Sequence, residues 1–227
     1  MARKRSTLKS IERRSLVDLA YEQILEQISR GEYREGDRIV IDELAIQLGV
    51  SRIPVREALA RLHAEHLLSY ERNKGYRVLP KPHYRELFEA RLLMEPSAIR
   101  YFGERITAKH IDELNSVNQR LAKLKIGRTF ANYIEFFQLN DAFHAVIIAA
   151  CGNQLADDAY RNLSYGPQWA RFAYGKGIPD KTIDVFEHDA IIAALADKDF
   201  QTAERLSEEH ITNGLKRFNE TYLDEEP

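Results

Sequence analysis

Two arginines at the start of a helical pattern are the first residues in this sequence whose type and spacing indicate chemistry. Arg52 and Arg56 lie in the segment GVSRIPVREALARL (residues 49–62), and their spacing of four places both on one face of a helix. A cation at the positive N-terminal end of a helix is unfavourable, which indicates that an anion binds there. Arginine can hold a phosphate or pair with guanine through two hydrogen bonds. The alternative is a solvated helix end, with Arg56 paired to a nearby carboxylate.

Three histidines form the second group with candidate chemistry. His144, His188 and His210 each lie in a long helical segment beside apolar residues, in NDAFHAVIIAA, VFEHDAIIAAL and RLSEEHITNGL. Imidazole nitrogen is a common ligand of zinc and nickel, and three histidines can form the protein part of an open metal site. Periodicity alone does not show that the three side chains converge. Three separate histidines, each hydrogen-bonded within the core, therefore remain the alternative at this point.

The two arginines require a framework, and the first part of the chain predicts one. Ser15 precedes a helical pattern that Gly31 ends, and a loop, GEYREGDRI, leads to a second short helix, IDELAIQL. Gly49 then allows a tight turn, and Ser51 is placed to cap a third helix. The apolar stripe of that helix consists of Val55, Ala58, Leu59 and Leu62. Helix, tight turn and helix together predict a helix-turn-helix unit.

A hairpin is predicted directly after the third helix. Residues 67–72 and 76–79 have strand character, and Asn-Lys-Gly between them forms the turn. Arg72, Lys74 and Arg77 would place positive charge on this hairpin, where it could contact phosphates or the minor groove. A hairpin behind a helix-turn-helix is a wing. The alternative is a hairpin whose basic side chains are simply solvated.

This first part of the chain resembles the winged helix-turn-helix domain of the GntR family of bacterial transcription regulators. The resemblance rests on GDRIVIDELAIQLGVSRIPVREALARL and on NKGYRV. It implies that Ser51, Arg52 and Arg56 contact DNA, and that Gly75 lies at the tip of the wing with Lys74 beside it. The implied partner is double-stranded DNA, as a pseudo-palindromic operator read by a homodimer.

The second part of the chain is predicted to be helical throughout. Pro80-Lys81-Pro82 can continue neither a helix nor a strand, so residues 80–83 are predicted to link two domains. Six segments of helical period follow: residues 84–102, 108–125, 131–150, 154–174, 181–196 and 199–223. An all-α bundle of six or seven helices fits these lengths.

The helical part resembles the FCD ligand-binding domain of the FadR-type branch of the same family, through Arg-x-x-x-Glu at 91–95, NDAFH…CGN and two later histidines. In metal-binding relatives, an aspartate four residues before the first histidine joins three histidines around a divalent cation. Here those histidines are His144, His188 and His210, and Asn140 occupies the aspartate position. A neutral amide is a weaker ligand than a carboxylate, so an implied Zn, Ni or Mn ion would favour an anionic further ligand more strongly. A metal-free site is the alternative.

Other residues of the helical part have structural alternatives. The resemblance implies that Arg91 reaches a cavity and holds a small carboxylate effector, whereas the alternative is an intrahelical ion pair with Glu95. Asn153 is predicted to cap the following helix, and Cys151 to be a small core residue. Trp169, Phe172 and Tyr174 are predicted to belong to the core or to a cavity wall.

Composition and charge restrict the classes of protein that fit. The chain has 227 residues, 44% hydrophobic and 30% charged, with a single cysteine, as in a folded protein without a disulfide framework. No apolar run is long enough for a membrane span and the basic start is not typical of a secretory signal, so a cytoplasmic location is expected. Residues 1–80 have 15 lysines and arginines against 12 acidic residues, and the remainder 18 against 23. The first part is therefore the better candidate for a polyanionic partner.

Together these patterns predict a mainly α protein. It would have a basic tail (1–14), a winged helix-turn-helix domain of three helices and a hairpin (15–79), the linker, and a helical effector-binding and dimerisation domain (84–223). The predicted function is a transcriptional regulator, expected to be a repressor, whose operator binding responds to a small carboxylate. Two alternatives stay open: a metal-dependent enzyme joined to a DNA-binding module, and a DNA-binding protein with a purely structural helical domain. No general base or catalytic motif is recognisable, so no enzymatic activity is predicted.

Overall fold

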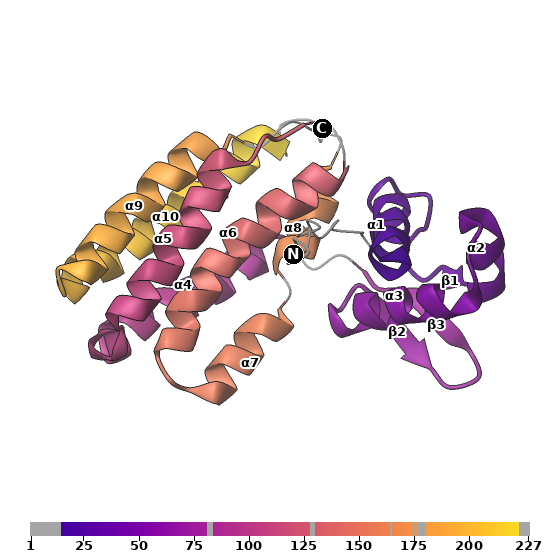
Figure 1. The fold of residues 1–227 in the computed structure, drawn as a ribbon, viewed down its shortest axis with the longest axis horizontal. Coiled ribbons are helices and arrows are strands. Elements are labelled where there is room, and N and C mark those ends of the chain that lie inside the picture. Colours follow the sequence, from indigo (N-terminus) through magenta and orange to yellow (C-terminus); the bar gives the residue numbers. More distant parts are fainter. Residues whose placement is uncertain are drawn as a thin grey trace, which may run out of the picture.

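The computed structural model of this chain (Figure 1) describes residues 15–80, 84–127, 130–163, 165–174, 176 and 180–222. Within these residues, a small domain of helices and a three-stranded sheet is joined to a larger domain of helices. None of the helices in this described part is long and apolar enough to cross a membrane. The predicted basic tail and most of the predicted linker lie outside the described residues.

The small domain has the predicted order of three helices followed by a hairpin. Its elements are α1 (Leu16–Ser29), β1 (Arg38–Ile39), α2 (Ile41–Leu48), α3 (Arg52–Ala64), β2 (Leu68–Glu71) and β3 (Gly75–Val78). The Ser15 hydroxyl caps α1 by accepting a hydrogen bond from the Asp18 N–H. Gly49 ends α2 with a φ of 65°, a left-handed conformation that favours glycine. The predicted apolar stripe of α3 is completely buried.

Two local predictions for this domain are wrong in detail. The segment predicted as a loop contains β1, which pairs antiparallel with β3, so the sheet order is β1-β3-β2. A strand of two residues is too short to show an alternating pattern, which explains the error. Ser51 occupies the N-cap position of α3, but its side chain makes no capping hydrogen bond. The Ser51 hydroxyl is therefore not committed to the helix end.

The larger domain has seven α-helices within its described residues. They are α4 (Tyr84–Phe102), α5 (Ala108–Lys123), α6 (Phe130–Ala150), α7 (Gln154–Asn162), α8 (Tyr165–Ala173), α9 (Lys181–Ala196) and α10 (Phe200–Tyr222), with a short 3-10 turn, η1 (Gly103–Arg105), after α4. The single segment predicted over 154–174 is two helices. Pro167 lies in the first turn of α8, a position that proline tolerates because no helical partner is lost there.

Helix α6 is the centre of the larger domain. It packs against α4, α5, α7 and α8, and most of its residues are buried. Gly166 lets α8 approach α6 closely, because a Cβ atom at this position would lie 3.3 Å from the backbone of Gln138. This close packing places Trp169, which is 3% exposed, in the interior.

Helix α8 also contacts the small domain. The Tyr174 hydroxyl, just beyond its end, donates a hydrogen bond of 2.8 Å to the Glu26 carboxylate on α1. Gln168 and Arg171 donate longer hydrogen bonds, both of 3.4 Å, to backbone carbonyls of the small domain. One helix therefore contributes both to the interior of the larger domain and to the junction between domains.

Candidate functional site

The N-terminus of α3 is exposed and carries the two predicted arginines. Arg52 Nε lies 2.7 Å from Asp42 Oδ1, and both side chains are more than half exposed, so a phosphate can displace this pair at low cost. Arg56 is exposed and has no ion pair within the described residues. Ile53, 66% exposed beside them, was missed in the sequence. The sequence did indicate it, because Ile53 is an apolar residue outside the buried stripe of α3.

The wing tip combines a turn that favours glycine with a local ion pair. Gly75 has a φ of 83°, which any other residue adopts only with strain. Lys74 Nζ lies 2.6 Å from Glu71 Oε2, with both side chains exposed. The rings of Tyr70 and Tyr76 lie 4.9 Å apart across β2 and β3 and stiffen the base of the wing. The hairpin therefore presents its tip to solvent in a fixed shape.

The three histidines, which come from different helices, meet in the interior of the larger domain. His144 on α6, His188 on α9 and His210 on α10 are each at most 4% exposed. One nitrogen from each ring lies within 4.8 Å of the others. The Nε2 atoms of His144 and His210 are 3.2 Å apart. The sequence left their convergence open, and the structure brings all three together.

Each of these imidazoles has an oxygen acceptor beside its Nδ1 atom. His188 is paired with Asn118 Oδ1 at 3.1 Å and His210 with Glu187 Oε2 at 2.7 Å. His144 Nδ1 lies 2.8 Å from Glu95 Oε2, at ion-pair distance but without hydrogen-bond geometry. An acceptor at Nδ1 assigns the proton to that nitrogen and leaves the Nε2 lone pair free for a ligand. This arrangement is the usual support for histidines that bind metals.

The histidine cluster fits a divalent cation. His188 Nε2 is buried and has no hydrogen-bond partner among the described residues. The lone pairs of His144 and His210 repel each other at 3.2 Å unless a proton or a cation lies between them. A second proton on a ring is opposed, because burial and the nearby Arg91 lower the pKa of His144 to about 3, and burial lowers the pKa of His188 well below its ordinary value. A neutral ring whose proton lies on Nε2 can donate to the other ring, and a cation removes the repulsion while both rings keep their protons on Nδ1.

Arg91 and Glu95 form a buried ion pair that belongs to the same network. Arg91 Nε donates to Glu95 Oε1 at 2.7 Å, and the Tyr160 hydroxyl donates to the same oxygen at 2.7 Å. Burial by itself would raise the pKa of Glu95, but Arg91 and His144 outweigh it and hold that pKa well below its usual range. The intrahelical pair considered in the sequence is present, and it supports the cluster.

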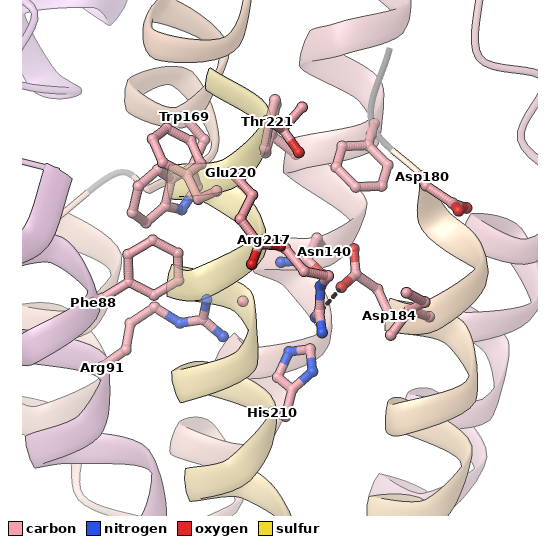
Figure 2. A pocket seen from close by; sticks show the side chains of 15 residues that line it. Phe88, Arg91, Asn140, Trp169, Asp180, Asp184, His210, Arg217, Glu220 and Thr221 are labelled. Carbon is pink, nitrogen blue, oxygen red and sulfur yellow. Dashed lines mark hydrogen bonds and ion pairs between the residues drawn. The ribbon is translucent and has the colours of Figure 1, made fainter. Parts of the chain in front are cut away.

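A cavity of about 300 Å³ adjoins this network, and Figure 2 shows its lining. Arg91, Asn140 and His210 all line it, and the rings of Phe88 and Trp169 lie on the same side as Arg91. The Asn140 side-chain oxygen is buried and has no hydrogen-bond partner within the described residues. Asn140 lies one turn before His144 on α6, so its side-chain oxygen offers a lone pair near the histidine cluster.

Two other predicted residues, Asn153 and Cys151, can be placed. Asn153 caps α7 through its side-chain oxygen, as predicted, and Cys151 is a buried core residue, as predicted. Asp141 accepts a hydrogen bond from the Gly166 N–H, and burial raises its pKa to about 7. It is therefore directed to α8 and does not replace Asn140. The side chain of Phe172 lies outside the described residues.

Arg217 is a cavity residue that the sequence did not reveal. Its Nη2 atom lies 2.8 Å from both Asp184 Oδ1 and Glu187 Oε2, as Figure 2 shows for Asp184. Burial opposes ionisation of Glu187, but hydrogen bonds from His210 and Arg217 lower its pKa to about 2. Its spacing from His210 could have indicated it, because Arg217 follows His210 by seven residues on α10 and therefore lies on the same face of the helix.

Fold and site define a class of protein: a winged helix-turn-helix domain joined to a helical domain that encloses a cavity beside a histidine cluster. The model of the gntR family of bacterial regulatory proteins matches residues 16–78, and the model of the FCD domain matches residues 86–213. This chain belongs to the GntR family of DNA-binding transcription regulators and carries an FCD domain. The predicted family and fold class are confirmed.

Individual relatives agree with this assignment. The chain is 33% identical to the Nta operon transcriptional regulator of Aminobacter aminovorans, over 73% of this chain and 77% of that protein. It is 26% identical to the transcriptional repressor GlaR of Escherichia coli, over 59% of this chain and 62% of GlaR. The solved structure of E. coli McbR/YncC has the same fold, with a TM-score of 0.64, 21% identity, and coverage of 92% of this chain and all of that one. The family, the Nta operon regulator and GlaR are transcription regulators, not enzymes.

Proposed function

We propose that this regulator is a repressor that releases its operator when a small carboxylate binds beside a metal ion in the helical domain. The observation that supports the metal and effector site is the histidine cluster, in which one ring nitrogen from each of three buried histidines lies within 4.8 Å of the others and an oxygen lies near each Nδ1 atom. A structural core would not require three lone pairs to face each other.

For DNA, we propose that α3 enters the major groove and that the wing contacts the backbone. Arg52 and Arg56 would read guanine or hold phosphates, with the Ser51 hydroxyl beside them. Their exposure and the weak pairing of Arg52 support this assignment. Lys74 and Gly75 at the wing tip would approach a neighbouring phosphate or the minor groove. Such a regulator acts on the chromosome, so we expect it in the cytoplasm.

For the metal, we propose Asn140, His144, His188 and His210 as ligands of a divalent cation such as Zn, Ni or Mn. When bound, the ion supplies a positive charge and open coordination positions that attract an anion. Asn140 would contribute a neutral oxygen, so the site would bind its ion less tightly than a carboxylate-containing site. Glu95, Glu187 and Asn118 orient the imidazoles.

For the effector, we propose that Arg91 holds a carboxylate at the end of the cavity near the histidines. Its guanidinium already has Glu95 as a partner on one edge, and it has further donors on the other edges. An arginine that lines a cavity while fixed by a buried carboxylate is pre-organised to receive an anion. The ligand would thus contact the same network that orients His144.

We propose that α8 transmits the binding event to the DNA-binding domain. Trp169 on α8 lines the cavity, and Gln168, Arg171 and Tyr174 contact the small domain. A shift of α8 by a ligand would change the position of α1 and, with it, that of α3. The effect is reciprocal, so operator DNA must weaken effector binding by the same factor.

We propose a homodimer as the binding unit. Leu93 and Tyr101 lie eight residues apart on one face of α4 and are 76% and 70% exposed. We infer that a second copy covers these two exposed apolar side chains. Two copies related by a twofold axis would read a pseudo-palindromic operator. Light scattering of the parent and a Leu93→Glu variant tests this, with a monomeric parent as the contradicting result.

The first test is the metal content of protein purified without a histidine tag or chelator. We expect about one metal per chain in the parent and in His110→Ala, and little in His188→Ala. Operator affinity is then measured with and without candidate carboxylates. Substoichiometric metal in all three proteins would contradict the proposed metal site. If no candidate carboxylate changes operator affinity, the proposed effector is contradicted.

A further inference from the structure

We propose that the ligand of this cavity is a monocarboxylate with a flat aromatic body. This inference rests on the proposed carboxylate effector and names its chemical class. It comes from how the cavity lining is divided between an aromatic wall, a polar end and a charged rim, which Figure 2 shows together.

The aromatic wall is continuous over three helices. Phe88 on α4, Trp169 on α8 and Phe218 on α10 line the cavity. The ring centroids of Phe88 and Trp169 are 4.7 Å apart, and those of Trp169 and Phe218 are 5.3 Å apart. All three side chains are buried, so their ring positions are fixed by packing rather than by solvent. Such a wall offers offset and edge-to-face contacts to one further ring.

The polar end lies directly beside this wall. Arg91 follows Phe88 by three residues on α4, so both side chains share one face of the helix. Asn140 and His210 also line the cavity. A carboxylate held by Arg91 and by the metal at the histidines would therefore have its body against Phe88 and Trp169. The carboxylate and the apolar body must be directly connected, as they are in an aryl carboxylate.

The charges of the lining indicate a single carboxylate. Arg91 and Arg217 line the cavity with Asp180, Asp184 and Glu220, but Arg91 is already paired with Glu95, and Arg217 with Asp184 and Glu187. A divalent cation at neutral histidine and asparagine ligands is therefore the main positive charge left for an anionic ligand. A second or third carboxylate on the ligand would meet the acidic side chains without a further cation.

The wall also selects against polyhydroxylated acids. Hydroxyl groups placed against ring faces would lose hydrogen bonds to water without replacement. A ring in the same place buries apolar surface and gains stacking contacts. The cavity volume of about 300 Å³ has room for one ring and its carboxylate. The lining therefore favours an aryl carboxylate over a sugar acid or a very short acid.

The chain carries its own reporter for this test, because Trp169 is its single tryptophan. Full-length protein loaded with Ni²⁺ is titrated with benzoate, acetate and gluconate, and binding is followed by Trp169 fluorescence and by calorimetry. We expect benzoate to bind about tenfold or more tighter than acetate or gluconate. We expect benzoate to change the fluorescence of Trp169, since its ring would lie against the indole.

Two ring deletions test whether the wall gives the preference. Phe88→Leu and Phe218→Leu each remove one wall ring, and Phe200→Leu removes a ring that packs against Gly103 and does not line the cavity. We expect either wall variant to bind benzoate several-fold more weakly while acetate is unaffected, and Phe200→Leu to bind like the parent. Having two wall variants keeps the test open if one does not fold.

The outcomes separate this inference from the proposed function. Equal affinities for benzoate, acetate and gluconate would overturn the aromatic class and leave the carboxylate effector intact. Binding of gluconate in preference to benzoate would do the same. If none of the three acids binds the Ni²⁺-loaded protein, both the aromatic class and the proposed effector fail.

Discussion

The two domains place their functional residues in opposite environments. In the DNA-binding domain, Arg52 and Arg56 lie outside a mainly apolar core and make at most one exposed ion pair. In the FCD domain, Arg91, Glu95 and the three histidines are themselves part of the core. An exposed pair contributes little to stability, whereas a buried charge that loses its partner is costly. Function and stability should therefore be separable in the first domain and inseparable in the second.

The largest effect is expected at Glu95, the most connected buried carboxylate. Glu95→Ala leaves the buried Arg91 without its counter-charge and removes the acceptor beside His144. We expect the free energy of unfolding of the metal-free protein to fall by about 3–5 kcal/mol. Urea unfolding measures this. The control is Glu209→Ala, which breaks an exposed pair with Arg205 and should change stability by less than about 1 kcal/mol. Equal losses in both variants would contradict the comparison.

The next effect is expected at Arg56, in binding rather than in stability. Arg56→Ala should weaken operator binding by roughly 10- to 100-fold, because a good arginine contact to a base contributes about 1–3 kcal/mol. Its free energy of unfolding should stay within about 0.5 kcal/mol of the parent. Gel-shift titration and urea unfolding measure the two quantities. Arg120→Ala, an exposed arginine of the FCD domain, is the control and should retain full operator affinity.

The same difference explains which features the sequence predicts. The DNA-binding residues follow from local pattern, because the stripe of α3 and the turn at Gly49 are set by neighbours a few residues away. The residues that orient the histidines cannot be predicted from local pattern. Asn118 and His188, for example, are 70 residues apart in the sequence and meet only in the folded bundle. The break between α7 and α8 was missed although Pro167 marks a first turn. The two-residue β1 leaves no pattern at all.

A third prediction separates two buried arginines of the FCD domain. Arg171 is 2% exposed and has only two long hydrogen bonds, to Gln168 Oε1 and the Leu79 carbonyl, with no carboxylate at ion-pair distance among the described residues. Burial lowers its pKa to about 10 in spite of the opposing attraction of Glu35. Arg171→Met removes this weakly compensated buried charge, and we expect stability to be unchanged or higher by about 1 kcal/mol. Arg91→Met leaves Glu95 unpaired and should destabilise by several times that amount, about 3 kcal/mol. Thermal unfolding at pH 7 measures both. Equal destabilisation would mean that Arg171 has a compensating partner.

The smallest effect concerns Cys151, which is buried like the histidines but has no part in the proposed site. Burial raises the pKa of its thiol to about 11, above the value of about 8.5 for an unfolded cysteine. Because the folded state keeps this proton longer, the thiol's contribution to stability is fully present below about pH 8.5 and is lost as pH rises toward 11. Iodoacetamide should therefore modify native Cys151 far more slowly than the urea-unfolded chain at pH 8, since the thiolate is the nucleophile. Rapid labelling of the native protein would show that the Cys151 thiol is only partly buried. Burial in this domain would then not by itself keep a reagent from reaching a side chain.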